Sequence, residues 1–252
     1  MSFKIAIISG RYPNTSFDSV VNHRIYADRY DLTYIHCNWP TKHKNLYFNK
    51  LQYLLEYIDI FDAIFWIDDD AFFIDFNIDI RELLPKNEHL ISICKSPDFK
   101  SLKTPFSSGQ FMMVCNEDSK EFLKKALETD LSQVKKWWIP EFGFFSNGDQ
   151  DALYYVSETH EKFKNCFEYH DYKSFNSRFE NLEKADVHSP FILHFTGKPE
   201  IKKENYKISQ KLLNRDSSLA PPTLLNNYNI ASQKKTTAKD VLKGILKKLM
   251  RR

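Results

Sequence analysis

Glycine is scarce in this sequence, with 6 residues among 252. The two glycine patterns that hold phosphates with backbone amides, GxGxxG and GxxxxGK[ST], are both absent. A dinucleotide-binding fingerprint and a P-loop are therefore excluded. If the protein binds a phosphorylated ligand, a metal ion and side chains must hold the phosphates.

Cysteine is also rare, and Cys37, Cys94, Cys115 and Cys166 are too far apart to form a CxxC pair. This spacing disfavours a zinc site or a thioredoxin-like motif and predicts buried thiols in a reducing compartment. No stretch approaches the roughly 18 apolar residues that a bilayer span requires, and no signal peptide is evident. We therefore expect a cytoplasmic protein.

Charge of one sign does not dominate, because the formal net charge is only +3. A value this small does not indicate nucleic acid, and no nucleic-acid motif is present. Aromatic residues make up 15% of the chain, which predicts a packed globular protein rather than a disordered one. The length suits one α/β domain with appendages.

Three consecutive carboxylates, Asp68, Asp69 and Asp70, follow the apolar run 63–67. That run predicts a buried strand, and ligands of open α/β sheets bind at the carboxyl ends of strands. On an extended segment Asp68 and Asp70 point to the same side, whereas Asp69 points away. Because adjacent carboxylates repel unless a cation or hydrogen bonds hold them, the pair predicts an Mg²⁺ or Mn²⁺ site. The alternative, a solvated acidic turn, is disfavoured by the apolar run 71–74.

Strands and helices alternate up to the acidic cluster, which predicts βαβ units and a mostly parallel sheet. Gly10, Arg11 and Tyr12 close the first strand as a ligand loop, and Lys50 lies near the start of a helix. The expected strands are 3–9, 32–36, 64–67, 89–94, 111–115 and 191–195, and the expected helices are 20–30, 48–58, 80–84, 117–128 and 147–156.

His194 ends another apolar strand and is our candidate for a third metal ligand. A lone histidine beside a strand is more often a satisfied core residue. Here Gly197 permits close backbone approach and Lys198 offers a point charge, so the segment favours phosphate binding.

An aromatic loop is expected over 137–145. Its rings could stack on an acceptor sugar, but core or lid packing is expected for at least two of the four. The four are Trp137, Trp138, Phe144 and Phe145.

The composition changes near residue 214, which divides the chain into a catalytic domain (1–213), a linker (214–236) and a terminal segment (237–252). The terminal segment places apolar residues at helical spacing against lysines and arginines. This pattern predicts a basic amphipathic helix that anchors the protein to an anionic membrane surface. A solvated helix or a disordered tail is the alternative.

The strings FWIDDDA (65–71), NHRIYA (22–27) and HFTG (194–197) together resemble glycosyltransferase family 34. That family comprises α-galactosyl-, α-mannosyl- and xyloglucan xylosyltransferases of GT-A fold. Ser108-Gly109 and DQDAL (149–153) also match. The last string and 194–199 are shared with family 8, the retaining α-galactosyl- and glucosyltransferases.

The resemblance implies a GT-A-type α/β fold, a mostly parallel sheet flanked by helices. It implies that Asp68 and Asp70 form the DxD pair for Mn²⁺ (or Mg²⁺) and the nucleotide, and that His194 is the additional metal ligand. Further donor contacts are implied or expected at Gly10, Arg11, Tyr12, Lys50, Asp69, Ser108, Gly109, Gly197 and Lys198.

Asp149 and Gln150 would lie at the reactive face of the donor sugar, where either could stabilise an oxocarbenium-like centre or act as a nucleophile. We therefore expect a metal-dependent retaining glycosyltransferase that moves a hexose, galactose in our interpretation, from a UDP-sugar to a glycan acceptor. That acceptor would be a cell-surface or lipid-linked glycan such as lipooligosaccharide or capsule, reached from the inner face of the cell membrane. The alternatives are a family 8-like transferase, a metal-dependent phosphohydrolase or nucleotidyltransferase, and a non-catalytic sugar- or lipid-binding module.

Overall fold

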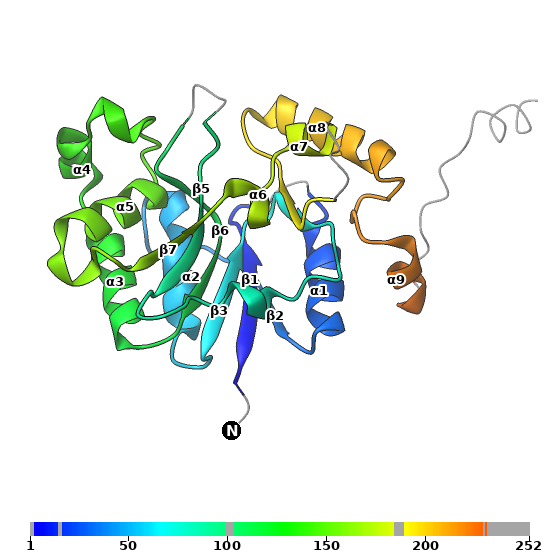
Figure 1. Ribbon diagram of the computed structural model, residues 1–252, viewed down its shortest axis with the longest axis horizontal. Helices are drawn as coiled ribbons and strands as arrows, with labels where there is room; N and C mark the ends of the chain where they lie inside the picture. The colour runs from blue at the N-terminus through cyan, green and yellow to red at the C-terminus, as the bar shows by residue number, and fades with distance from the viewer. Residues whose placement is uncertain (1–2, 15–16, 99–102, 184–188, 229, 231–252) are drawn as a thin grey trace, which may run out of the picture.

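The computed structural model describes residues 3–14, 17–98, 103–183, 189–228 and 230. Its centre is a six-stranded sheet in the order β2-β1-β3-β6-β5-β7 (Figure 1). The strands are β1 (Ile5–Gly10), β2 (Thr33–Cys37), β3 (Ala63–Ile67), β5 (Ile91–Lys95), β6 (Phe106–Val114) and β7 (Phe167–His170). Five of the six run in one direction, and β6 is antiparallel to both of its neighbours. The predicted α/β class with a mostly parallel sheet is confirmed.

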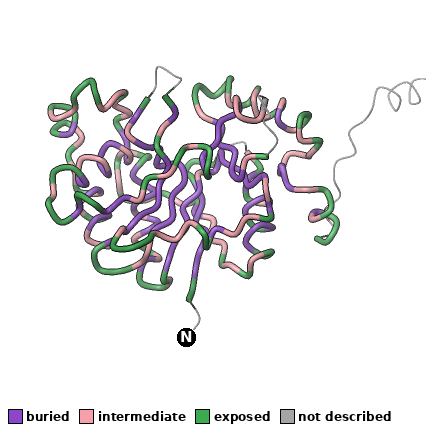
Figure 2. Tube along the Cα trace, viewed as in Figure 1, coloured by how far each residue is buried: buried purple, intermediate pink, exposed green. Residues whose placement is uncertain are grey.

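Helices cover both faces of this sheet. On one face Leu51, Phe122 and Leu153 share a core with Ile64 and Trp66 of β3. They come from α2 (Asn49–Tyr57), α3 (Glu117–Glu128) and α5 (Asp149–Thr159). The four inner strands, β1, β3, β6 and β5, are almost entirely buried (Figure 2), which explains the continuous apolar runs of β1 and β3.

The other face is covered by α1 (Ser19–Arg29), α6 (Tyr172–Phe175) and α9 (Pro222–Asn227). Tyr26, Phe175 and Leu225 of these helices pack with Phe65 and Ile67. The remaining helices are α4 (Leu131–Trp137), α7 (Phe179–Glu183) and α8 (Pro199–Leu212), and short 3₁₀ turns are Leu46–Phe48, Ile80–Leu83, Pro140–Phe142 and Glu161–Phe163. The short helix expected at 80–84 is therefore a 3₁₀ helix over Ile80–Leu83.

A second sheet of two antiparallel strands, β4 (Ala71–Phe73) and β8 (Ile192–His194), lies beside the first. Ala71 is the register partner of His194. Asn22 of α1 fixes β4 through two hydrogen bonds, because its amide nitrogen donates to the Phe73 carbonyl (2.9 Å) and its oxygen accepts from the Phe73 N–H (2.8 Å). The acidic cluster between β3 and β4 is thus held from both sheets.

One further predicted element differs from the structure. Strand β6 begins at Phe106, five residues before the expected start, so Ser108 and Gly109 belong to a strand beside β3 instead of a loop. Helix α9 lies within the segment expected to be a linker, where Leu219, Ala220 and Leu225 are buried. The described part of that segment therefore packs onto the domain, and the predicted basic helix at 237–252 lies outside the described residues.

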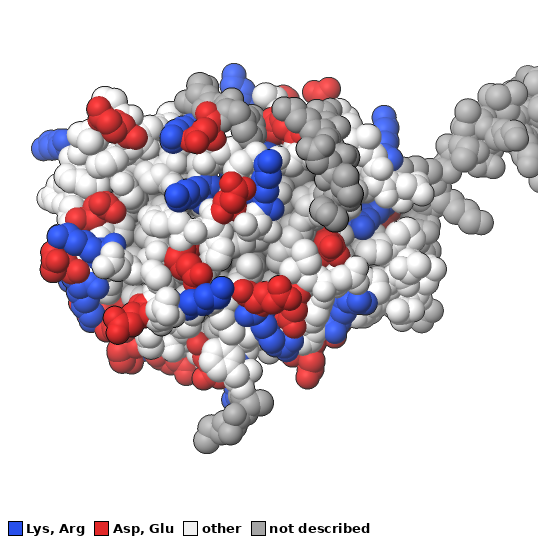
Figure 3. Space-filling view, in the orientation of Figure 1, with Lys and Arg blue, Asp and Glu red and all other residues white. Residues whose placement is uncertain are grey.

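Acidic and basic side chains are interspersed on the face seen in Figure 3, in keeping with the small net charge of +3. Among the described residues, no helix combines the length and apolar character that crossing a bilayer requires.

Candidate metal and donor-sugar site

A cavity of about 940 Å³ opens at the carboxyl ends of β1 and β3. Strand β6, the N-terminus of α5 and the segment after β8 form its other walls. Twelve of the residues predicted to bind metal, donor or substrate line it: Gly10, Arg11, Tyr12, Lys50, Asp68, Asp70, Ser108, Gly109, Asp149, Gln150, His194 and Gly197. The fold therefore brings twelve of the fourteen predicted residues to the wall of one cavity.

Asp68 is held by β3, which it follows directly, and by the neighbouring strand β6. Its backbone N–H donates to the carbonyl of Gly109 (2.8 Å). Its Oδ1 accepts a hydrogen bond from the Trp66 indole (2.7 Å) and lies 3.3 Å from Lys50 Nζ. Its Oδ2 is turned toward His194, 4.0 Å from Nε2.

Asp70 is buried, and as in Asp68 one carboxylate oxygen faces His194 while the other is paired with a cation. Oδ1 lies 3.2 Å from His194 Nε2, whereas Oδ2 is paired with Lys202 of α8 and lies 3.8 Å from Arg11 Nη2. Burial by itself would raise the pKa of Asp70, but the hydrogen bond to His194 and the charges of His194, Lys202 and Arg11 outweigh it and hold the pKa well below its usual range. Asp70 is therefore a carboxylate at neutral pH.

His194 presents Nε2 to the two aspartates and Nδ1 to a buried polar pair. Nδ1 lies 2.8 Å from Arg178 Nη1 and 3.0 Å from Asn176 Oδ1. Burial lowers the pKa of His194, as the Arg178 charge does, although Asp70 and Asp68 act in the opposite sense. A neutral imidazole at physiological pH is the form that can ligate a metal.

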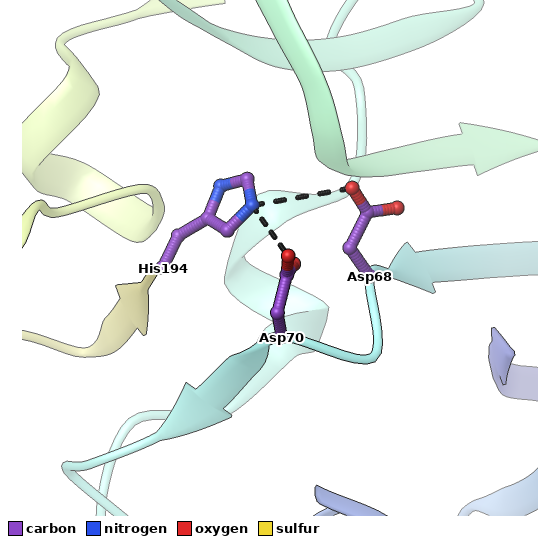
Figure 4. Close-up of side chains that lie close together, drawn as sticks. All are labelled: Asp68, Asp70 and His194. Carbon is purple, nitrogen blue, oxygen red and sulfur yellow. Dashed lines mark ion pairs between the residues drawn. The ribbon is translucent and has the colours of Figure 1, made fainter. Parts of the chain in front are cut away.

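These three side chains fit a divalent cation. One ligand atom each from Asp68, Asp70 and His194 lies within 4.8 Å of the others (Figure 4). Two carboxylates and an imidazole suit Mn²⁺ and Mg²⁺, with further positions left for substrate oxygens. In each of the three side chains, the polar atom that does not face the others is bound by a neighbouring residue, which orients the candidate ligand atom.

Gly109 is part of the same arrangement. A Cβ at this position would lie 2.4 Å from His194 Cε1 and 3.2 Å from Asp68 Oδ2. Only a glycine lets β6 pass this close to the three ligands.

Lys50 joins the metal ligands to the candidate catalytic pair. Its Nζ lies 3.1 Å from Asp149 Oδ2 and donates to the Ser108 carbonyl (2.8 Å). Burial would lower the pKa of Lys50, but Asp149 and Asp68 more than offset it and the pKa is raised. The side chain of Asp149 also accepts from Ser108 Oγ (2.8 Å), and Gln150 Oε1 accepts from the Ser108 N–H (3.2 Å).

Two predicted residues do not line the cavity. Asp69 is buried beside it and lies 3.1 Å from Arg11 Nε, as expected for a side chain that points away from Asp68 and Asp70. Lys198 is exposed at the N-cap of α8, whereas Lys202, one turn further along, reaches both the cavity and Asp70.

Sequence reasoning missed Lys202, Asn176 and Arg178. In the sequence, none of the three follows an apolar run of the kind that identified the other site residues. A spacing of one helical turn from Lys198 was the available signal for Lys202. Asn176 and Arg178 gave none, because their approach to His194 is tertiary.

The aromatic loop divides as expected. Trp137 and Trp138 pack against Phe142 and Tyr154, and Phe145 packs against Trp138. Phe144 alone of the four lines the cavity.

Comparison with solved structures identifies the fold. A glycosyltransferase involved in the glycosylation of the major capsid of PBCV-1 matches with a TM-score of 0.60 and 14% identity, over 80% of this chain and 98% of that chain. GlyE from Streptococcus pneumoniae TIGR4 matches with a TM-score of 0.54 and 14% identity, over 90% of this chain and 64% of GlyE. No protein-family model matches the chain. No curated protein matches its sequence either.

The architecture is therefore the GT-A fold of glycosyltransferases. At 14% identity these similarities establish the fold alone, and membership of family 34 is not confirmed.

Proposed function

We propose that this protein is a metal-dependent, retaining glycosyltransferase that moves galactose from UDP-galactose to a glycan acceptor. The observation that carries the proposal is the convergence of Asp68, Asp70 and His194 in the wall of a cavity in a GT-A fold. Such a cluster at the end of a strand suits a nucleotide-sugar, whose diphosphate needs positive charge. Retention and the choice of galactose rest on the resemblance to families 34 and 8.

The cation would be Mn²⁺ or Mg²⁺, held by Asp68, Asp70 and His194. When bound, it would supply positive charge to the departing diphosphate. Lys202 and Arg11 add two protein cations at the same place, because both lie against Asp70 and line the cavity. Gly10 and Tyr12 would lie by the nucleoside, and Gly197 and Lys198 by the phosphates.

Asp149 and Gln150, the candidate catalytic pair, differ in their contacts and in their exposure. Asp149 Oδ2 is shared between Lys50 and Ser108, which suits a carboxylate that positions the donor sugar. Gln150 is more exposed in the same cavity and would face the anomeric carbon, where positive charge develops. Ser108 and Gly109 would contact the donor sugar.

The acceptor in this proposal is a cell-surface or lipid-linked glycan such as lipooligosaccharide or capsule. The predicted basic helix at 237–252 would hold the enzyme at the inner face of the cell membrane. Removal of residues 237–252 should release the protein from anionic liposomes, and equal sedimentation with and without them would contradict this anchor.

A thermal-shift screen of UDP- and GDP-sugars with and without Mn²⁺ tests the donor and the cation together. Ligands that bind only the folded state raise its stability by mass action, so UDP-galactose plus Mn²⁺ should raise the Tm more than either alone. Asp70→Ala should abolish the Mn²⁺-dependent part. Unaltered ligand binding in that variant would instead support a non-catalytic sugar-binding module.

The products separate the proposal from its enzymatic rivals. A glycosyltransferase releases UDP together with a transferred sugar. Release of inorganic phosphate or pyrophosphate would instead identify a phosphohydrolase or a nucleotidyltransferase.

A further inference from the structure

Three apolar side chains that line the cavity are at least half exposed. The exposed fractions are 55% for Leu46, 64% for Tyr47 and 50% for Phe144. All three line the same cavity as Asp149 and Gln150. Leu46 and Tyr47 belong to the 3₁₀ turn before α2, and Phe144 belongs to the loop before α5.

The segment that carries Tyr47 contacts the segment between Phe144 and α5, and these contacts position the exposed rings. Asn45 Nδ2 donates to the carbonyl of Asn147 (3.0 Å). A Cβ at Gly148 would lie 3.4 Å from Cβ and Cγ of Tyr47, which places Tyr47 in contact range of the α5 N-cap. Phe144 is fixed by its N–H, which donates to the Lys103 carbonyl (2.7 Å). These apolar side chains therefore adjoin the N-terminus of α5, where Asp149 and Gln150 lie.

Among the aromatic side chains of its loop, Phe144 is the most exposed. Trp137, Trp138 and Phe145 contact one another or nearby rings, whereas Phe144 faces the cavity with half of its surface exposed. Burial of aromatic surface is favourable, so a ring held open in the wall of a cavity indicates a ligand that covers it.

Building on the proposed function, we infer that Tyr47 and Phe144 form the acceptor platform and that its occupant is a pyranose ring. One face of a pyranose carries C–H groups that pack on aromatic rings, and its edge carries hydroxyls. Polar side chains of the same two segments also line this cavity, namely Lys44, Asn45 and Ser146. That mixture suits a sugar better than a lipid chain, which would need a continuous apolar surface.

The position also fits the reaction. An acceptor hydroxyl must approach the donor sugar, and the platform adjoins the Asp149–Gln150 end of the cavity. Tyr47 also lies within electrostatic range of Arg11 in the loop proposed for the nucleoside. Tyr47 and Phe144 would therefore set acceptor affinity, and Phe144 would contribute little to donor affinity.

The test separates transfer from donor hydrolysis. Methyl glycosides of glucose, galactose, mannose and xylose serve as acceptors, with UDP-galactose and Mn²⁺ held constant, and UDP release is measured with and without acceptor. Phe144→Ala and Tyr47→Ala should lower the ratio of transfer to hydrolysis about tenfold through a higher acceptor KM. Tyr47→Phe and Phe144→Tyr keep a ring and should retain most of the transfer.

Ile139→Ala is the matched control, because Ile139 is 44% exposed in the same loop but does not line the cavity. Its ratio should equal that of the wild type. An equal loss of donor binding in Phe144→Ala, or no stimulation of UDP release by any glycoside in a wild type that hydrolyses the donor, would overturn the platform. A wild type that does not bind UDP-galactose with Mn²⁺ would overturn the proposed function itself.

Discussion

The indole N–H of Trp66 donates a 2.7 Å hydrogen bond to Oδ1 of Asp68, two residues further along the chain. Residues i and i+2 of an extended segment point to the same side, so the strand itself brings donor and acceptor together. The bond occupies one oxygen of Asp68 and leaves Oδ2 directed at His194. Trp66 is thus a positioning residue for a candidate metal ligand.

Trp66→Phe should weaken Mn²⁺ binding on the order of tenfold, because it removes the N–H but keeps an aromatic ring in the core. Isothermal titration of Mn²⁺ in the presence of UDP measures the affinity. Trp138→Phe is the matched control, since its indole donates a similar bond to the Gly143 carbonyl (2.8 Å) away from the metal ligands. Equal Mn²⁺ affinities in the two variants would exclude the positioning role.

Gly109→Ala should reduce Mn²⁺ affinity on the order of a hundredfold. The added methyl group would lie 2.4 Å from His194 Cε1, so the imidazole must move away from the two aspartates. Gly148→Ala is a useful comparison, because its Cβ would meet Tyr47 at an ordinary 3.4 Å. If both variants bind Mn²⁺ as the wild type does, His194 is not a metal ligand.

Lys202 and Lys198 offer a paired test of the phosphate contact. Lys202 lies on Asp70 and in the cavity, whereas Lys198 is exposed at the N-cap of α8. We expect Lys202→Gln to weaken Mn²⁺–UDP binding on the order of tenfold and Lys198→Gln to change it less than about twofold. Titration calorimetry of both variants decides between them, and the reverse order would favour the contact implied by the resemblance.

The sequence predicted the parts of this site that lie at the ends of apolar strands. Asp68, Asp70 and His194 each end or follow a run whose burial is encoded locally, so their convergence at one sheet edge follows from the α/β pattern. Ser108 and Gly109 were identified only through the resemblance, because residues 107–110 of β6 carry no apolar strand pattern. Lys202, Asn176 and Arg178 depend on how α8 and the segment before β8 fold back, which local periodicity does not encode.

The buried His23 connects α1 to the strand that follows the acidic cluster. Its side chain is fully buried, and Nε2 lies 2.8 Å from the Ala71 carbonyl. Burial lowers the pKa of His23 to about 3, and the charge of His36 acts in the same direction. His23 is therefore neutral in the folded protein throughout the physiological range.

The sign of the pH dependence follows from these pKa values. The unfolded chain binds a proton at His23 below its ordinary pKa of about 6.5, whereas the folded protein does so only near pH 3. The stability that depends on neutral His23 is present above about pH 6.5 and is lost as the pH falls, by up to about 1.4 kcal/mol per pH unit. His23→Gln keeps a nitrogen that can donate to Ala71 and cannot take up this proton. In urea unfolding, the wild type should therefore lose about 2 kcal/mol more than His23→Gln between pH 8 and pH 5, and parallel curves would show that His23 takes up no extra proton on unfolding.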